Sequence, residues 1–304
     1  MGSTVGQVSA RDGVVLRTRT WAPRGAPWAA ALLVHGLGEH SGRYERVGER
    51  LAEAGIDARA FDQRGFGASG GRRAYVDRWA EFGADVADRL DALRSDSPDL
   101  PLVLYGHSLG GLIVLDAVIR GAVRPDLVVL SAPALGDAMP GWLHGLARVM
   151  TAVVPTLALG DGLPPDGLSR DPAVAADVAA DPLNLTRVTV RLGAESFAAQ
   201  EAIGRRLASL DHLPAPTYVL HGSADPIVPA SSTDGLERFP EVTRVVHAGL
   251  RHECHNEPEG EAVVDAIVDW LRDSTAALRS GQQKIASGER TSAESVAQPQ
   301  TRGT

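Results

Sequence analysis

The sequence predicts an α/β fold, in which a mostly parallel sheet is covered by helices on both faces. Short apolar runs that end near a glycine recur along the chain, and such runs are typical of strands buried on both faces of a sheet. Segments with helical spacing of apolar residues alternate with these runs, which favours parallel strands joined by helices. One long interruption of the alternation predicts an inserted cap.

The predicted elements follow one another in a regular order. VVLRTRTWAP (14–23) is expected to form an edge strand or the arm of a hairpin, since apolar and polar residues alternate in it. The pattern shows no internal repeat. Further strands are predicted at 30–36, 56–62, 101–108, 127–133, 217–222 and 243–249, and helices at 44–55, 78–96, 109–121, 197–209, 231–238 and 261–273.

Residues 135–195 break the alternation. They are rich in proline, show no clean strand and contain the apolar segment GWLHGLARVMTAVVPTLAL (141–159). An insertion of about 60 residues is too long for a plain connection, so we expect a cap over the mouth of the sheet. The α/β domain is therefore expected to occupy 1–274. Residues 275–304 are expected to be disordered, because few of them are apolar.

Composition restricts the class of protein. The 304 residues carry a formal net charge of −8 without a basic stretch, so nucleic acid is not an expected partner. The single cysteine, Cys254, excludes an intramolecular disulfide framework and a multi-cysteine metal site. The first residues lack a secretory signal pattern, and no apolar run reaches the length of a membrane span, about 18 residues. These features predict a cytoplasmic protein, with contact at the membrane surface left open.

The segment GHSLG (106–110) matches the pattern G-x-S-x-G between a predicted strand and a predicted helix. This is the context of a nucleophile elbow. Glycines permit a tight turn that would crowd any larger side chain, and the N-terminus of the helix directs free N–H groups to the same place. The pattern predicts that Ser108 is a nucleophile. The alternative is a glycine-rich turn with an incidental serine.

A nucleophilic serine needs a base, and the base needs an acid that orients it. In this fold the acid and the base follow the nucleophile in loops after later strands, at the edge where ligands collect. Asp225 follows the predicted strand 217–222, and His252 follows the last predicted strand. They are the expected acid and base. Asp234 and Asp265 compete as acids, but they fall in predicted helices away from that edge.

An oxyanion hole requires two backbone N–H donors. Leu109 directly follows the nucleophile and supplies one of them. The second is expected from the glycine-rich loop after the strand 30–36, where Leu37 is the candidate. The alternative for this loop is an ordinary turn at the exit of a strand.

Taken together, these segments resemble the monoacylglycerol lipase group of serine α/β-hydrolases, close to the lysophospholipases and the serine aminopeptidase-like hydrolases. The resemblance extends over nearly the whole chain up to the tail, and its most specific segment is the first. The matching segments are HGLGEHSGRY (35–44), FDQRGFGASGG (61–71), GHSLGG (106–111), LSAP (130–133), SRDP (169–172), DPL (181–183), HGSADPIVP (221–229) and HECHNEPEGEAVVD (252–265).

The resemblance implies the α/β-hydrolase fold and hydrolysis of carboxylic esters without a metal or an organic cofactor. It implies that Ser108, Asp225 and His252 form a catalytic triad and that Leu37 and Leu109 supply the oxyanion amides. It also places Glu39 and Arg43 at the polar end where the glycerol moiety sits. The cap matches only in the short SRDP and DPL segments, so it carries no implication for acyl-chain preference.

Two other motifs point away from this chemistry, and we reject both. GFGASG (65–70) matches G-x-G-x-x-G, but no apolar helix follows it, as a dinucleotide site would require. RHECHNEPEG (251–260) resembles a zinc-binding helix, but His255 stands three residues after His252 instead of four, and Pro258 follows too soon for a continuous helix. Cys254 is expected to be a small apolar residue, although its closeness to His252 suggests that thiol reagents could block activity there.

The expected function is hydrolysis of monoacylglycerols to fatty acid and glycerol. A lysophospholipase, a short-chain carboxylesterase, a peptidase, a cofactor-free haloperoxidase and an inert lipid- or partner-binding scaffold remain as alternatives. The expected partner is a small lipid ester. The apolar segment of the cap either packs on the body or contacts a membrane or micelle surface transiently. The sequence leaves the oligomeric state open.

Overall fold

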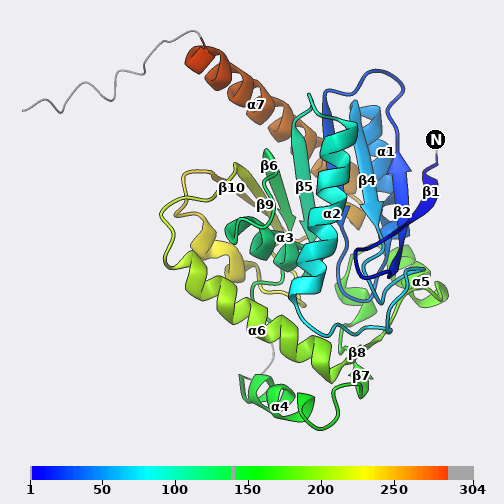
Figure 1. The fold of residues 1–304 in the computed structure, drawn as a ribbon. Helices are drawn as coiled ribbons and strands as arrows, with labels where there is room; N and C mark the ends of the chain where they lie inside the picture. Colours follow the sequence, from blue (N-terminus) through cyan, green and yellow to red (C-terminus); the bar gives the residue numbers. More distant parts are fainter. Residues whose placement is uncertain (1, 138–140, 287–304) are drawn as a thin grey trace, which may run out of the picture.

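The computed structural model of the chain describes residues 2–137 and 141–286. Its centre is a single eight-stranded sheet in which β2 pairs antiparallel with both of its neighbours, β1 and β4, and the neighbouring strands from β4 onward are parallel (Figure 1). The mostly parallel sheet predicted from the sequence is therefore confirmed. The strand order is β1 (Thr4–Ser9), β2 (Val15–Trp21), β4 (Ile56–Phe61), β3 (Ala29–Val34), β5 (Leu102–His107), β6 (Leu127–Ser131), β9 (Thr217–Gly222) and β10 (Val242–His247).

Helices cover both faces of the sheet (Figure 1). Along β5, Leu102 and Leu104 belong to one buried core, whereas Val103 and Tyr105 belong to the other. Successive side chains of a strand point to opposite faces, so a strand buried on both sides must be apolar throughout. One face packs against α2 (Ala80–Asp96), α3 (Leu109–Ile119) and α6 (Val190–Leu207), and the other against α1 (Glu45–Glu53) and α7 (Gly260–Ala286).

The inserted cap lies beyond the carboxyl ends of the parallel strands (Figure 1). Two short strands pair antiparallel in it and form a small second sheet. The described elements of the cap are α4 (Gly141–Thr151), β7 (Ala158–Gly160), the 3₁₀ helix η2 (Pro165–Gly167), α5 (Pro172–Ala180) and β8 (Arg187–Thr189). Three further 3₁₀ helices lie outside it: η1 (Ser41–Tyr44), η3 (Ala230–Leu236) and η4 (Cys254–Asn256).

Several element boundaries predicted from the sequence were wrong. The cap does contain strands, β7 and β8, although each has only three residues and too little length for a period to show. Helix α6 begins at Val190 and not at 197, because the Thr189 side chain accepts a hydrogen bond from the N–H of Leu192 and so caps the helix early. The predicted helix 231–238 is a 3₁₀ helix.

The sequence predicted a disordered tail from residue 275 onward, but the structure shows regular secondary structure beyond Ser274. Helix α7 continues to Ala286, and Leu278 still packs against the core that this helix covers. Tertiary packing adds to helix formation here, which composition alone does not reveal. Residues 287–304, the rest of the predicted disordered tail, lie outside the described residues. Among the helices that the structure describes, none combines the length and apolarity needed to cross a bilayer.

Helix α3 approaches the sheet so closely that only glycine fits at the contact. A Cβ on Gly110 would lie 2.2 Å from the carbonyl oxygen of Val34 and 2.5 Å from that of His35. Both oxygens belong to the backbone of the sheet and its exit loop, so they cannot move aside as a flexible side chain could. The N-terminus of α3 is thereby fixed against the loop that follows β3.

We expect Gly110→Ala to lower the free energy of unfolding by about 1–3 kcal/mol, because the added methyl group overpacks a rigid contact. Gly83→Ala is the matched control, since Gly83 lies within α2 and a Cβ there would meet nothing within 4 Å. The control should gain up to about 1 kcal/mol from helix propensity. Urea unfolding of both variants checks this, and equal effects would contradict the packing argument.

Candidate active site

Ser108 occupies the sharp turn between β5 and α3. Its backbone φ is +51° and ψ is −117°, a conformation that residues other than glycine rarely adopt. The surrounding structure holds it there: the N–H of Ser108 donates to the carbonyl of Ser131 over 2.9 Å, and its own carbonyl accepts from the N–H of Ala134 over 3.0 Å. This strained turn is the geometry that the G-x-S-x-G pattern predicted.

Asp225 and His252 lie together, as expected. His252 Nδ1 lies 2.7 Å from Asp225 Oδ2, and both side chains are buried. Burial raises the pKa of Asp225, but hydrogen bonds with His221 and His252 outweigh it and lower that pKa well below its ordinary value. The carboxylate stays charged beside the ring. With Nδ1 directed at Asp225, only Nε2 of His252 is left for another partner.

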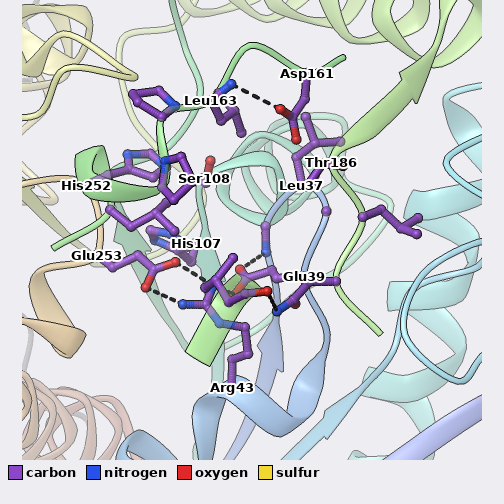
Figure 2. A pocket seen from close by; sticks show the side chains of 18 residues that line it. Leu37, Glu39, Arg43, His107, Ser108, Asp161, Leu163, Thr186, His252 and Glu253 are labelled. Atoms are coloured by element: carbon purple, nitrogen blue, oxygen red, sulfur yellow. Dashed lines mark hydrogen bonds and ion pairs between the residues drawn. The ribbon is translucent and has the colours of Figure 1, made fainter. Parts of the chain in front are cut away.

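Ser108 and His252 line the same cavity (Figure 2). The described residues show no hydrogen bond between the two side chains, and contacts of this kind often tighten only when a substrate binds. The competing acids lie elsewhere: Asp234 pairs with Arg244, and Asp265 pairs with Arg50. The structure therefore brings together the three side chains that the sequence selected. His221, which also contacts Asp225 over 3.0 Å, was missed because a histidine that closes a strand carries no pattern.

The two candidate oxyanion donors flank Ser108. Leu109 begins α3, and N–H groups in the first turn of a helix have no acceptor within it. The N–H of Leu37 has no hydrogen-bond partner in the described part of the chain. Leu37, Ser108 and Leu109 line a common cavity. The arrangement provides two free backbone donors beside the candidate nucleophile.

The loop that carries Leu37 is held from both sides. Below it, Glu39 Oε1 accepts from the N–H of Gly36 and from the hydroxyl of Tyr44. Above it, the carbonyl of Gly38 accepts from the N–H of Leu185 in the cap over 2.7 Å. Glu39 thus supports the loop in addition to lining the cavity, a role that the sequence did not reveal.

A buried ion network joins this loop to the loop of His252. Arg43 binds Glu253 through two hydrogen bonds of 2.6 and 2.7 Å and also contacts Glu39 over 3.1 Å (Figure 2). Burial raises the pKa of Glu253, but the Arg43 charge outweighs it, and the net effect lowers that pKa. Glu253 was missed by the sequence reasoning, because its partner is distant in the chain and only folding brings the two together.

The remaining residues of the RHECHNEPEG stretch are structural. His255 is buried, its ring stacks on Tyr44 with centroids 5.3 Å apart, and burial lowers its pKa to about 4. The ring therefore lies inside the protein and braces the site from behind instead of facing solvent. Cys254 is fully buried, and burial raises the pKa of its thiol to about 12. An inaccessible neutral thiol reacts poorly, which argues against the expected block by thiol reagents.

Two cavities meet at Ser108. The first, which we name the polar cavity, has a charged end lined by Glu39, Arg43 and Glu253, although most of its remaining lining is apolar. The second has a volume of about 350 Å³, and its lining is mostly apolar, including Leu112, Phe197 and Ile227. An apolar cavity that joins, at a nucleophile, a second cavity with one charged end suits an amphipathic ester. Within the described residues, no group of three or more histidine, cysteine or acidic side chains is arranged to hold a metal ion.

The fold and this site define an α/β-hydrolase, and comparisons with known proteins agree. The family described as "Serine aminopeptidase, S33" matches residues 25–259, which is most of the sequence, so the chain belongs to this family. The monoacylglycerol lipase of Mycolicibacterium smegmatis is 33% identical over 272 residues, which cover 85% of this chain and 93% of the relative. Human monoglyceride lipase is 32% identical over 278 residues, covering 87% and 89%.

A solved structure leads to the same family. The crystal structure of Paleococcus ferrophilus monoacylglycerol lipase is 33% identical in sequence and superimposes with a TM-score of 0.75, covering 85% of this chain and 99% of that one. The expected resemblance and the α/β-hydrolase fold with its inserted cap are thus confirmed. Together these findings support an ester hydrolase.

The ion network predicts a specific dependence of stability on pH. Arg43→Met leaves Glu39 and Glu253 buried without their cation, which should lower the free energy of unfolding by about 3–5 kcal/mol at neutral pH. In the wild type, the pKa of Glu253 is lower in the folded state than its ordinary value of 4.5. The ionised carboxylate therefore stabilises the fold at pH values above 4.5, and this stabilisation is lost as the pH falls through the folded-state pKa. In the variant, burial without Arg43 raises the pKa of Glu253 above its ordinary value. The ionised carboxylate then destabilises the fold, and this destabilisation is relieved as the pH falls.

The difference in unfolding free energy between wild type and Arg43→Met should therefore narrow as the pH falls towards 4.5. Chemical denaturation at a series of pH values measures it. Arg50→Met is the matched control, since Arg50 forms its ion pairs at the surface and should contribute little at any pH. A difference that stays constant with pH would contradict the role assigned to the buried charges.

Proposed function

We propose that the chain hydrolyses monoacylglycerols to free fatty acid and glycerol, with Ser108 as nucleophile, His252 as base and Asp225 as the acid that orients it. The observation that carries the proposal is the buried His252–Asp225 pair, which shares a site with a strained, cavity-lining Ser108. The monoacylglycerol lipases among the relatives support the choice of substrate.

The reaction follows from the positions of these groups. Ser108 Oγ attacks the ester carbonyl while His252 takes its proton through Nε2, since Nδ1 is bound to Asp225. The charged Asp225 stabilises the imidazolium that forms. The N–H groups of Leu37 and Leu109 stabilise the negative oxygen of the tetrahedral intermediate. His252 then gives the proton to the leaving alcohol, and a water molecule activated by the same base releases the acyl group.

The two cavities divide the substrate between them. The apolar cavity of about 350 Å³ takes the acyl chain, because its lining offers few hydrogen-bonding groups. The glycerol part occupies the polar cavity, where Glu39 and Arg43 contact its hydroxyls. Oxygens of Glu39 accept hydrogen bonds, and the guanidinium of Arg43 donates them.

Ser108→Ala should lower the release of fatty acid from monoacylglycerols by about a million-fold, because loss of the nucleophile disables the whole triad. Ser95→Ala is the matched control, since the hydroxyl of Ser95 donates to the carbonyl of Asp91 at the surface, away from both cavities. Its activity should match the wild type. Titrating the released fatty acid measures both.

The substrate panel decides between the alternatives. Activity confined to lysophospholipids or to short test esters would keep the triad and overturn the monoacylglycerol assignment. Absence of hydrolysis with any ester, in wild type and variant alike, would instead favour an inert binding scaffold.

We further propose that the cap contacts a lipid surface transiently. Trp142, Leu146 and Val149 lie on one face of α4, and Val153 follows just beyond its end. Their side chains are unusually exposed for apolar residues: 67%, 44%, 68% and 78%, respectively. Such a patch on the cap suits an enzyme whose substrate is held in an aggregate or a bilayer.

Replacing Trp142 and Val149 together by serine should reduce hydrolysis of monoacylglycerol in vesicles about tenfold or more and leave hydrolysis of a water-soluble short ester unchanged. Val246→Ser, at an exposed apolar position on β10 that is 40% accessible, is the control and should affect neither substrate. Equal losses with both substrates would indicate damage to the fold instead of lost surface contact.

A further inference from the structure

Asp161 of the cap lies where the two cavities meet. It comes directly after β7 and is half-buried. Both cavities are lined by it, together with Ser108 and Leu37. An ester bound at Ser108 would therefore occupy cavities that this carboxylate also lines.

The contacts of Asp161 leave one carboxylate oxygen free. Oδ1 accepts a hydrogen bond of 3.1 Å from the N–H of Leu163, and the backbone N–H of Asp161 donates to the carbonyl of Thr186 over 3.0 Å. These bonds fix the position of the residue. Oδ2 has no hydrogen-bond partner among the described residues, and it faces the oxyanion loop, since a Cβ on Gly38 would lie 3.9 Å from it.

The charge of Asp161 is also uncompensated. The polar cavity is lined by the carboxylates of Glu39, Asp161 and Glu253 and by a single guanidinium, that of Arg43. Arg43 is already bound to both glutamates, and Figure 2 shows it on the opposite side of the cavity from Asp161. No charged side chain among the described residues stabilises the Asp161 carboxylate, and burial raises the pKa of that carboxyl above its ordinary value. The alcohol part of a substrate therefore enters a cavity with an excess of negative charge.

We propose that Asp161 determines specificity for the alcohol part of the ester, favouring alcohols that donate hydrogen bonds or carry a positive charge and rejecting anionic ones. The inference rests on the proposed ester hydrolysis at Ser108 and adds to it a selection by charge. An ionised carboxylate only accepts hydrogen bonds, so a glycerol hydroxyl suits its free oxygen, whereas a phosphate monoester brings like charge and no suitable donor. In a half-buried cavity this repulsion is much less screened than in water.

Specificity is a difference between substrates, so the test compares esters that share one acyl chain. The probes are a neutral monoacylglycerol, the corresponding lysophosphatidic acid, the acylcholine and the methyl ester, each assayed at mildly alkaline pH, where the carboxylate is charged. The variant is Asp161→Asn, which keeps the shape of the side chain and removes its charge. Asp177→Asn is the matched control, since Asp177 lies exposed on α5 and lines neither cavity.

Each kcat/KM is divided by the value for the methyl ester with the same protein, which removes any general change in activity. In Asp161→Asn, the ratio for lysophosphatidic acid should rise about tenfold, and the ratio for acylcholine should fall by a similar factor. Both ratios should stay at the wild-type value in Asp177→Asn. Opposite shifts for opposite charges cannot result from a loosened cap, which would change the two ratios in the same direction.

Unchanged ratios in Asp161→Asn, or shifts of the same size in Asp177→Asn, would overturn the inference. A wild type that hydrolyses the methyl ester but not the monoacylglycerol would overturn the proposed substrate alone, because the two charge ratios would still report on Asp161. A wild type that hydrolyses none of the four esters would overturn both proposals.

Discussion

The close contact between the N-terminus of α3 and the exit of β3 governs the rest of the site. Gly110 lies against the carbonyls of Val34 and His35, where no side chain fits, and this contact sets the path of the chain from β5 into the helix. Ser108 is left in a strained conformation at the top of the turn. Such strain persists only where the surrounding structure over-determines it. The same contact also places the first N–H groups of the helix next to the loop of Leu37.

Buried charge connects the loops that this contact brings close. Arg43 holds Glu253 next to His252, and Glu39 holds the N–H of Gly36 at the start of the oxyanion loop. Each carboxylate is buried, so each depends on its partner to offset the cost of leaving water. The neighbouring His255 is kept neutral by burial, with its pKa lowered to about 4. Charge is therefore concentrated on a few fixed groups around the proposed base.

The two sides of the cap differ in their surroundings. Its inner side docks on the body through backbone contacts such as that between Leu185 and Gly38, and it contributes Asp161 to the cavities. Its outer side exposes the apolar face of α4. The proposed substrate, with an apolar chain and a polar head, would meet complementary surfaces on the proposed path from a lipid aggregate to Ser108. The proposals on surface contact and on charge selection thus concern opposite sides of one insertion.

The sequence by itself predicted the order of the strands and helices along the chain and selected Ser108, Asp225 and His252 as the candidate triad, because buried strands and an elbow require local patterns that can be read directly. It also located the cap, though not its short strands or the early start of α6 at Val190, which are too brief or too dependent on the single Thr189 cap bond to show a period. Only the tertiary structure decided the partners of Arg43, Glu39 and Asp161. The Arg43–Glu253 pair joins residues 210 positions apart, which no local pattern reveals. The side-chain contacts of Glu39 and Asp161 are close in sequence, but they depend on loop conformations that only the folded structure fixes.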